Sequence, residues 1–98
     1  MKDKETIIRI AADYFKSQPV VKVWLFGSFS RDEQTEDSDV DILIAPESNV
    51  GLFKLSGMYL DLQQLLGMPV DLITEKGLMD FARKSVERDK ILIYERAA

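Results

Sequence analysis

The chain has 98 residues, of which 46% are apolar and 31% are charged, and its formal net charge is -4. This length fits one globular domain, so we expect a single domain spanning residues 1–98. Cysteine and histidine are both absent from the sequence. Their absence excludes disulfides, thiolate and imidazole metal sites, cysteine nucleophiles and a histidine general base.

Charge and hydropathy also limit the partners and the compartment. An acidic chain without a basic stripe is a poor candidate for direct nucleic-acid binding, because phosphate contacts dominate the affinity of such proteins. No apolar run reaches the length of a membrane span, and residues 1–5 lack an apolar signal region. We therefore expect a cytoplasmic protein that does not enter the membrane. The sequence leaves open whether the chain forms a homo-oligomer.

Hydrophobic periodicity predicts alternating helices and strands along the chain. In chain order, the expected elements are a helix over residues 4–17, a strand over 20–26, a short helix over 28–34, a strand over 39–45, a helix over 52–66, a strand over 70–74, a helix over 77–88 and a short strand over 91–94. The order αβαβαβα(β) predicts an α/β (α+β) fold, in which helices pack on a small mixed sheet of three to four strands.

Three residues mark the helix ends and one interior position. Asp3 is a candidate N-cap for the first helix, and Gly67 stands where the helix over 52–66 needs a C-terminal cap. Gly57 lies inside that helix, where glycine costs about 1 kcal/mol relative to alanine. This cost predicts close packing against the backbone at Gly57.

A phosphate-binding turn is the first candidate functional feature. The strand over 20–26 ends at Gly27-Ser28 and leads into a helix. Glycine lets a ligand approach the backbone, and the free N–H groups at a helix start attract anions. The Ser28 hydroxyl can donate to a phosphate oxygen, and Arg31, one turn along, can reach the same place. Such turns are common, so the pattern alone does not establish a site.

Three aspartates form the second feature. Asp39 and Asp41 are two residues apart, so in a strand their side chains share one face, and paired carboxylates suit Mg²⁺. Taken alone, the pair is also what a solvent-facing strand would show. Asp71 lies in the otherwise apolar run Val70–Thr74, where a buried carboxylate is costly unless it is paired or bound to metal. If the two strands are neighbours, three carboxylates converge beside the Gly27-Ser28 turn.

Together these residues resemble a known family. Gly27-Ser28-x-x-Arg31, followed after six residues by Ser38-Asp39-x-Asp41 and later by Val70-Asp71-Leu72, is similar to the signature of the minimal nucleotidyltransferase (MNT) family of the DNA polymerase β-like superfamily. The resemblance implies the nucleotidyltransferase fold, two Mg²⁺ ions and ATP as substrate. It implies that all three aspartates are catalytic metal ligands, and that Gly27, Ser28 and Arg31 bind the nucleotide.

The chain departs from the family pattern around the arginine. Many members have a small residue before the arginine and a glycine after it, whereas here Ser30 precedes Arg31 and Asp32 follows it. Asp32 adds negative charge near the start of the expected short helix. A role for Asp32 in capping that helix explains it better than a role in catalysis.

The resemblance also implies a protein partner. Minimal members of the family often pair with a HEPN-type helical toxin and act as antitoxins by adenylylating it. This implies that the chain transfers AMP from ATP to a hydroxyl, with a tyrosine of such a toxin as the favoured acceptor. Two alternatives stay open: an antitoxin that neutralises its partner by occlusion without catalysis, and a subunit of a two-chain enzyme that modifies a small molecule such as an antibiotic.

Overall fold

A mixed sheet forms the centre of the computed structural model, which describes residues 2–97. Within these residues the strand order is β3-β2-β1-β4, with β1 antiparallel to both β2 and β4, and with β2 parallel to β3. The elements are α1 (Lys4–Phe15), β1 (Val20–Phe26), α2 (Gly27–Ser30), β2 (Val40–Pro46), α3 (Leu52–Leu66), β3 (Val70–Thr74), α4 (Asp80–Asp89) and β4 (Ile91–Glu95). The expected fold class and element order are confirmed.

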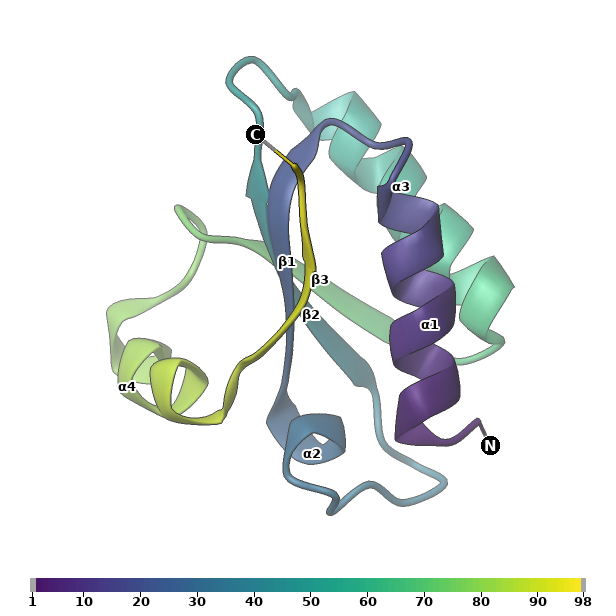
Figure 1. Ribbon diagram of the computed structural model, residues 1–98. Helices are drawn as coiled ribbons and strands as arrows, with labels where there is room; N and C mark the ends of the chain where they lie inside the picture. Colours follow the sequence, from purple (N-terminus) through teal and green to yellow (C-terminus); the bar gives the residue numbers. More distant parts are fainter. Residues whose placement is uncertain (1, 98) are drawn as a thin grey trace.

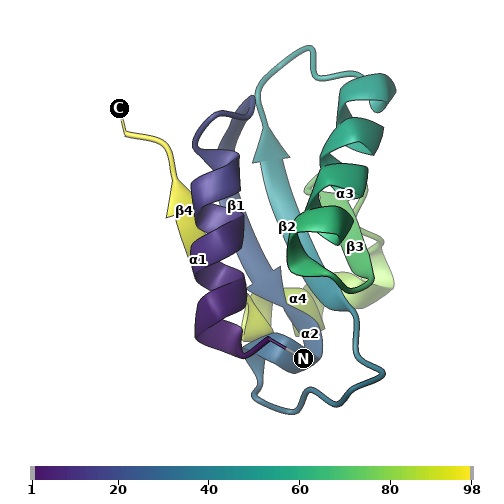
Figure 2. The same cartoon turned by 90° about the vertical axis from the view of Figure 1, so that its right-hand side faces the viewer.

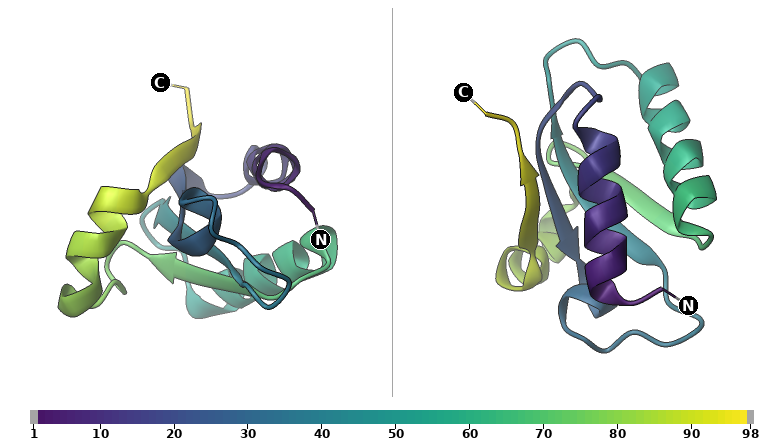
Figure 3. Two further views of the ribbon diagram at one scale, coloured as in Figure 1. Left: turned by 90° about the horizontal axis from the view of Figure 1, so that it is seen from below. Right: turned by 45° about the vertical axis from the view of Figure 1, so that its right-hand side comes forward.

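Helices cover both faces of the sheet. Helices α1 and α3 lie side by side on one face (Figure 2), and α4 lies on the other (Figures 1 and 3). Side chains alternate between the two faces along a strand. In β2, Ile42 and Ile44 therefore pack toward α1 and α3, whereas Leu43 packs toward α4 with Trp24 and Val86.

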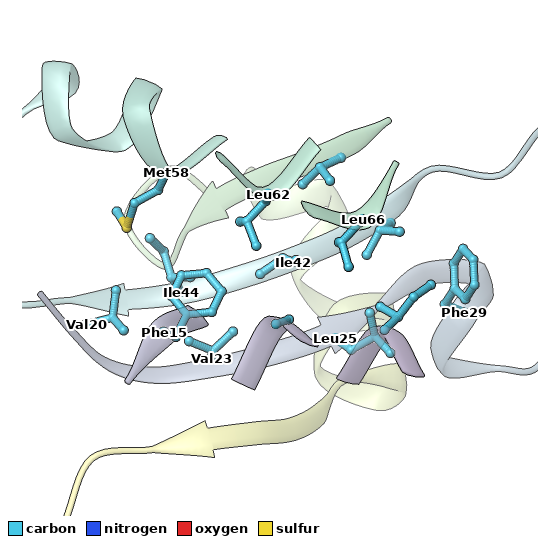
Figure 4. Packing of buried hydrophobic residues seen from close by; sticks show 14 residues of the cluster. Phe15, Val20, Val23, Leu25, Phe29, Ile42, Ile44, Met58, Leu62 and Leu66 are labelled. Atoms are coloured by element: carbon cyan, nitrogen blue, oxygen red, sulfur yellow. The ribbon is translucent and has the colours of Figure 1, made fainter. Parts of the chain in front are cut away.

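The larger core lies between the sheet and the α1–α3 pair. Figure 4 shows this packing, in which every labelled side chain is at most 1% exposed: Phe15, Val20, Val23, Leu25, Phe29, Ile42, Ile44, Met58, Leu62 and Leu66. Because Phe29 belongs to α2, the core also anchors the short helix that follows β1. The turn at Gly27-Ser28 is thereby fixed to the end of the sheet.

The predicted caps of α1 and α3 are confirmed, but the packing expected at Gly57 is wrong. Asp3 accepts a hydrogen bond of 2.8 Å from the Thr6 N–H at the start of α1. Gly67 ends α3 in the left-handed conformation, with φ of 66°. A methyl group placed on Gly57 would meet no atom within 4 Å. The glycine there has no packing reason that the structure explains.

Several element boundaries differ from the prediction, most of them by one residue. Helix α1 ends at Phe15 rather than at residue 17, and β2 begins after Asp39. Helix α2 is a single turn ending at Ser30 instead of extending to residue 34, because Asp32 adopts φ of 58°, which an α-helix cannot accommodate. Helix α4 begins at Asp80 rather than at residue 77, since residues 75–79 form a turn.

The remaining features of the fold are the lengths of the helices and the apolar side chains exposed on them. No helix within residues 2–97 is long and apolar enough to cross a membrane. Several large apolar side chains are exposed on α3 and around the start of α4, among them Phe53 at 96% and Phe81 at 89%.

Candidate active site

Gly27 and Asp41 form the tightest contact of the candidate site. Gly27 follows β1 directly and has φ of +72°, while Phe26 is the register partner of Asp41 in the antiparallel β1–β2 pair. A methyl group on Gly27 would overlap the Asp41 Oδ2 atom and lie 2.9 Å from its Cγ. Glycine is therefore required here twice, by the backbone conformation and by the approach of the carboxylate.

The short helix α2 presents a small polar turn beside this contact. The Ser30 hydroxyl donates a 2.7 Å hydrogen bond to the Gly27 carbonyl oxygen, and Phe29 is fully buried. Ser28 is half-buried next to Gly27. The first backbone N–H groups of a helix have no partner within the helix. The turn can therefore offer backbone N–H groups and the Ser28 hydroxyl to an anion.

The three aspartates meet at the amino-terminal ends of β2 and β3. Asp41 and Asp71 are register partners in the parallel β2–β3 pair, so both side chains lie on the face that carries α4. Asp39 precedes β2 by one residue. The predicted neighbourhood of the two strands is confirmed. The expectation that Asp71 is buried is wrong, because β3 is an edge strand whose Asp71 is exposed to solvent.

Burial and neighbouring charges act on Asp41. The pKa of Asp41 is raised from 3.8 to about 6, first by burial, then by the negative charges of Asp71 and Asp39, and the positive charge of Arg31 partly opposes this rise. Burial therefore accounts for the largest part of the rise, and the two neighbouring carboxylates add to it.

The donor set fits a hard divalent cation, although the side chains are not gathered around one point. Within residues 2–97, no three acidic side chains converge closely enough to hold a metal ion. The chemistry nevertheless fits Mg²⁺, because it prefers carboxylate oxygens as ligands and Asp41 lies beside Asp71 in the β2–β3 register. Asp39 and Asp71 are exposed, so their side chains are free to rotate toward Asp41.

The Arg31 guanidinium binds Glu33 and Asp89 rather than the three aspartates of the site. Its Nε donates to Glu33 at 2.9 Å and its Nη1 donates to Asp89 at 3.0 Å. The structure therefore places Gly27, Asp41 and Asp71 next to one another, with Ser28 and Asp39 adjacent in the chain and Arg31 joined to α4. Asp32 follows the end of α2 and accepts an ion pair from Lys4 at 3.3 Å. The capping role predicted for Asp32 at the helix start is wrong, because Asp32 lies beyond the helix end.

Asp89 is the residue at this site that the sequence did not reveal. It lies 58 positions after Arg31 and reaches it only because α4 folds back over the sheet. Its exposed fraction is 10%. A carboxylate at a helix C-terminus is unfavourable for the helix dipole, and this unfavourable placement was the only sequence signal that could have singled Asp89 out.

Comparison with known proteins gives a consistent result. A family model described as a nucleotidyltransferase domain matches residues 5–93. A protein of Methanocaldococcus jannaschii, provisionally named a protein adenylyltransferase, is 43% identical over 75 residues, which cover 76% of each chain.

Solved structures agree in fold. One that is described as a provisional minimal nucleotidyltransferase has a TM-score of 0.79 and 35% identity, covering 92% of this chain and 95% of that one. The MNT antitoxin complex with the tri-AMPylated HEPN toxin of Shewanella oneidensis gives a TM-score of 0.65 at 18% identity, covering 95% of this chain and 70% of that one. At that identity the second match concerns the fold alone.

Proposed function

We propose that this chain, which belongs to the nucleotidyltransferase domain family, transfers AMP from ATP to a hydroxyl group of a partner protein. Membership makes the chain a nucleotidyltransferase, and the acceptor is the proposed part. The observation that carries the proposal is the contact of Gly27 with Asp41, in register with Asp71. This contact sets a phosphate-binding turn directly beside a cluster of carboxylates.

The aspartates take the metal-binding and proton-accepting roles in this proposal. Asp39 and Asp41 hold Mg²⁺, with Asp71 sharing one ion. When bound, Mg²⁺ neutralises charge on the phosphates and makes a coordinated hydroxyl more acidic. Asp71 is the most accessible of the strand carboxylates and faces the same side as Asp41. It is therefore placed to orient the acceptor hydroxyl and take its proton.

The Gly27-Ser28 turn and Arg31 bind the triphosphate. The backbone N–H groups of the turn and the Ser28 hydroxyl donate to phosphate oxygens, as preorganised donors do where negative charge develops. The acceptor oxygen forms a bond to the α-phosphorus, and the bond between the α-phosphorus and the oxygen that bridges it to the β-phosphate breaks. AMP is thereby joined to the acceptor, pyrophosphate leaves, and Asp71 takes the proton of the hydroxyl, so no histidine is needed.

A tyrosine of a HEPN-type toxin is the proposed acceptor. The M. jannaschii relative is provisionally named a protein adenylyltransferase, and the S. oneidensis structure pairs an MNT antitoxin with an AMPylated HEPN toxin. Both support a protein as the acceptor.

Labelled ATP tests the reaction. The protein is incubated with Mg²⁺, the product of the neighbouring helical-protein gene, and ATP labelled at either the α- or the γ-phosphate. We expect only the α-label to reach the partner, on a tyrosine identified by mass spectrometry. Transfer of the γ-label would refute nucleotidyl transfer.

Matched variants assign the site. Asp39→Asn and Asp41→Asn should each reduce α-label transfer at least a hundredfold, as removal of a group that stabilises transition-state charge does. Asp37→Asn makes the same chemical change at an exposed position of the same loop and should leave transfer intact. If the partner receives no label but is still neutralised by all three variants, the chain acts by occlusion instead.

A further inference from the structure

Asp89 is the last residue of α4, and its side chain binds Arg31, which follows the phosphate-binding turn. Its Oδ2 accepts a hydrogen bond from Arg31 Nη1 at 3.0 Å. Arg88 donates two hydrogen bonds to the same carboxylate, from Nε to Oδ1 at 2.9 Å and from Nη2 to Oδ2 at 3.2 Å. At 10% exposure, the Asp89 side chain is the most buried member of this group. Arg88 and Arg31 therefore hold Asp89 in one orientation.

The Arg31 guanidinium donates hydrogen bonds to two carboxylates. Its Nε donates to Glu33 at 2.9 Å, and its Nη1 donates to Asp89. A guanidinium carries five N–H donors in a rigid plane. Its Nη2 group makes no hydrogen bond to any residue in the range 2–97. Fixing two edges of a planar group fixes the third, so the direction of Nη2 depends on Asp89.

Arg31 is also tied to the phosphate-binding turn through its backbone. It follows α2 directly and its own backbone N–H donates to the Gly27 carbonyl oxygen at 3.3 Å. Arg31 thus lies between the α4 terminus and the turn that faces the phosphates.

We propose that Asp89 is a positioning residue for the nucleotide: it orients Arg31 so that the free Nη2 group faces the triphosphate. The proposal rests on the function proposed above. It makes the carboxyl-terminal end of α4, remote in sequence from the Gly27-Ser28 turn, part of the nucleotide-binding apparatus. Arg88 acts one step further away by holding Asp89.

A double-mutant cycle on nucleotide affinity tests this role without any acceptor. The dissociation constant of AMP-PNP with Mg²⁺ is measured by calorimetry for the unaltered chain, Asp89→Ala, Arg31→Ala and the double variant. Loss of an oriented charged contact to phosphate should weaken binding by about tenfold in each single variant. In the double variant the effect of Asp89→Ala should fall below about twofold, because its target is gone.

Controls separate positioning from folding. Asp80→Ala removes a carboxylate from the other end of α4, where it pairs with Arg83 at 3.7 Å, and should leave the affinity unchanged. Asp89→Asn keeps one acceptor oxygen and should recover part of the loss, which also serves if Asp89→Ala does not fold. Equal weakening by Asp89→Ala with and without Arg31 would overturn the proposal, since it would indicate a structural role alone.

The outcomes also distinguish the two proposals. If AMP-PNP binds and the cycle is additive, only the role of Asp89 is refuted. If the cycle is coupled but no α-label reaches any partner, Asp89 still positions Arg31 for a nucleotide, and the transfer reaction is refuted. Failure of the unaltered chain to bind AMP-PNP with Mg²⁺ would overturn both.

Discussion

Replacement of Gly27 by alanine should damage stability and activity together, for two separable reasons. The first is backbone strain, because φ of +72° lies in the left-handed region, which costs an L-residue roughly 1–2 kcal/mol. The second is steric, because the new methyl group would overlap Asp41 Oδ2 and lie 2.9 Å from Cγ. Displacement of a packed group typically adds about 1–3 kcal/mol.

The chain contains a matched control for the strain. Gly67 has φ of +66°, and the nearest atom to a methyl group there is Lys2 Nζ at 3.7 Å, an ordinary contact. Gly67→Ala should therefore show the strain alone, about 1–2 kcal/mol. Gly27→Ala should lose about 2–5 kcal/mol, since overlap with Asp41 adds to the strain.

Thermal and denaturant unfolding measure the difference. In a domain of this size, 1 kcal/mol lowers Tm by about 4–8 °C. Gly67→Ala should melt lower than the unaltered chain but retain AMP transfer, whereas Gly27→Ala should melt lower still and lose transfer. In an Asp41→Ala background, the cost of Gly27→Ala should fall toward that of Gly67→Ala, because Oδ2 and Cγ are removed and only the Cβ remains nearby, at 3.2 Å.

Two results would refute this reasoning. Equal loss of stability in Gly27→Ala and Gly67→Ala would mean that Asp41 moves aside at no cost. Full AMP transfer by Gly27→Ala would mean that the approach of Asp41 to the backbone is not needed for the reaction. Asp41→Ala is inactive in either case, so it serves in the stability measurements only.

Three further predictions concern single side chains. Because the pKa of Asp41 is raised to about 6, its protonation stabilises the folded chain, fully below about pH 4 and progressively less as pH rises through about 6. In unfolding titrations without metal, this half-exposed group should contribute about 1–2 kcal/mol to the free energy of unfolding at low pH. Asp41→Asn should remove this pH-dependent contribution. Tyr14→Phe removes the 2.6 Å hydrogen bond to Asp61 that joins α1 to α3 and should cost about 1 kcal/mol in urea unfolding; an unchanged midpoint would contradict it. Asp3→Ala removes the N-cap of α1 and should cost about 1 kcal/mol, measured by the loss of Tm, and Asp13→Ala in the same helix serves as the control.

Local chemistry made most of the fold predictable. The β-branched and aromatic run of β1 and the alternation in β2 identified two strands, and Asp3 and Gly67 marked helix ends. The errors arose where a backbone conformation overrode the apolar pattern. Asp32 enters the left-handed region at φ of 58° and ends α2 after one turn. Aspartate is one of the few non-glycine residues enriched in that region, but the residue type alone does not specify the conformation.

The sequence predicted the neighbourhood of the β2 and β3 strands, but the geometry of the candidate site only in part. The parallel pairing of β2 and β3 brings Asp41 beside Asp71. The exposure of Asp71, however, depends on the strand order, because β3 is an edge strand that leaves Asp71 in solvent. The contact between Arg31 and Asp89 spans 58 residues. Such a contact depends on how α4 packs across the sheet, which no local pattern encodes.

The local environment of Asp41 connects stability to the proposed function. Burial disfavours the ionised carboxylate, and the negative charges of Asp71 and Asp39 add to that penalty, while the absence of a side chain at Gly27 leaves room for the carboxylate. A cation bound at Asp41 would offset the repulsion from Asp71 and Asp39, but not the cost of burial. Such a balance is expected when a fold retains locally unfavourable residues because its function requires them.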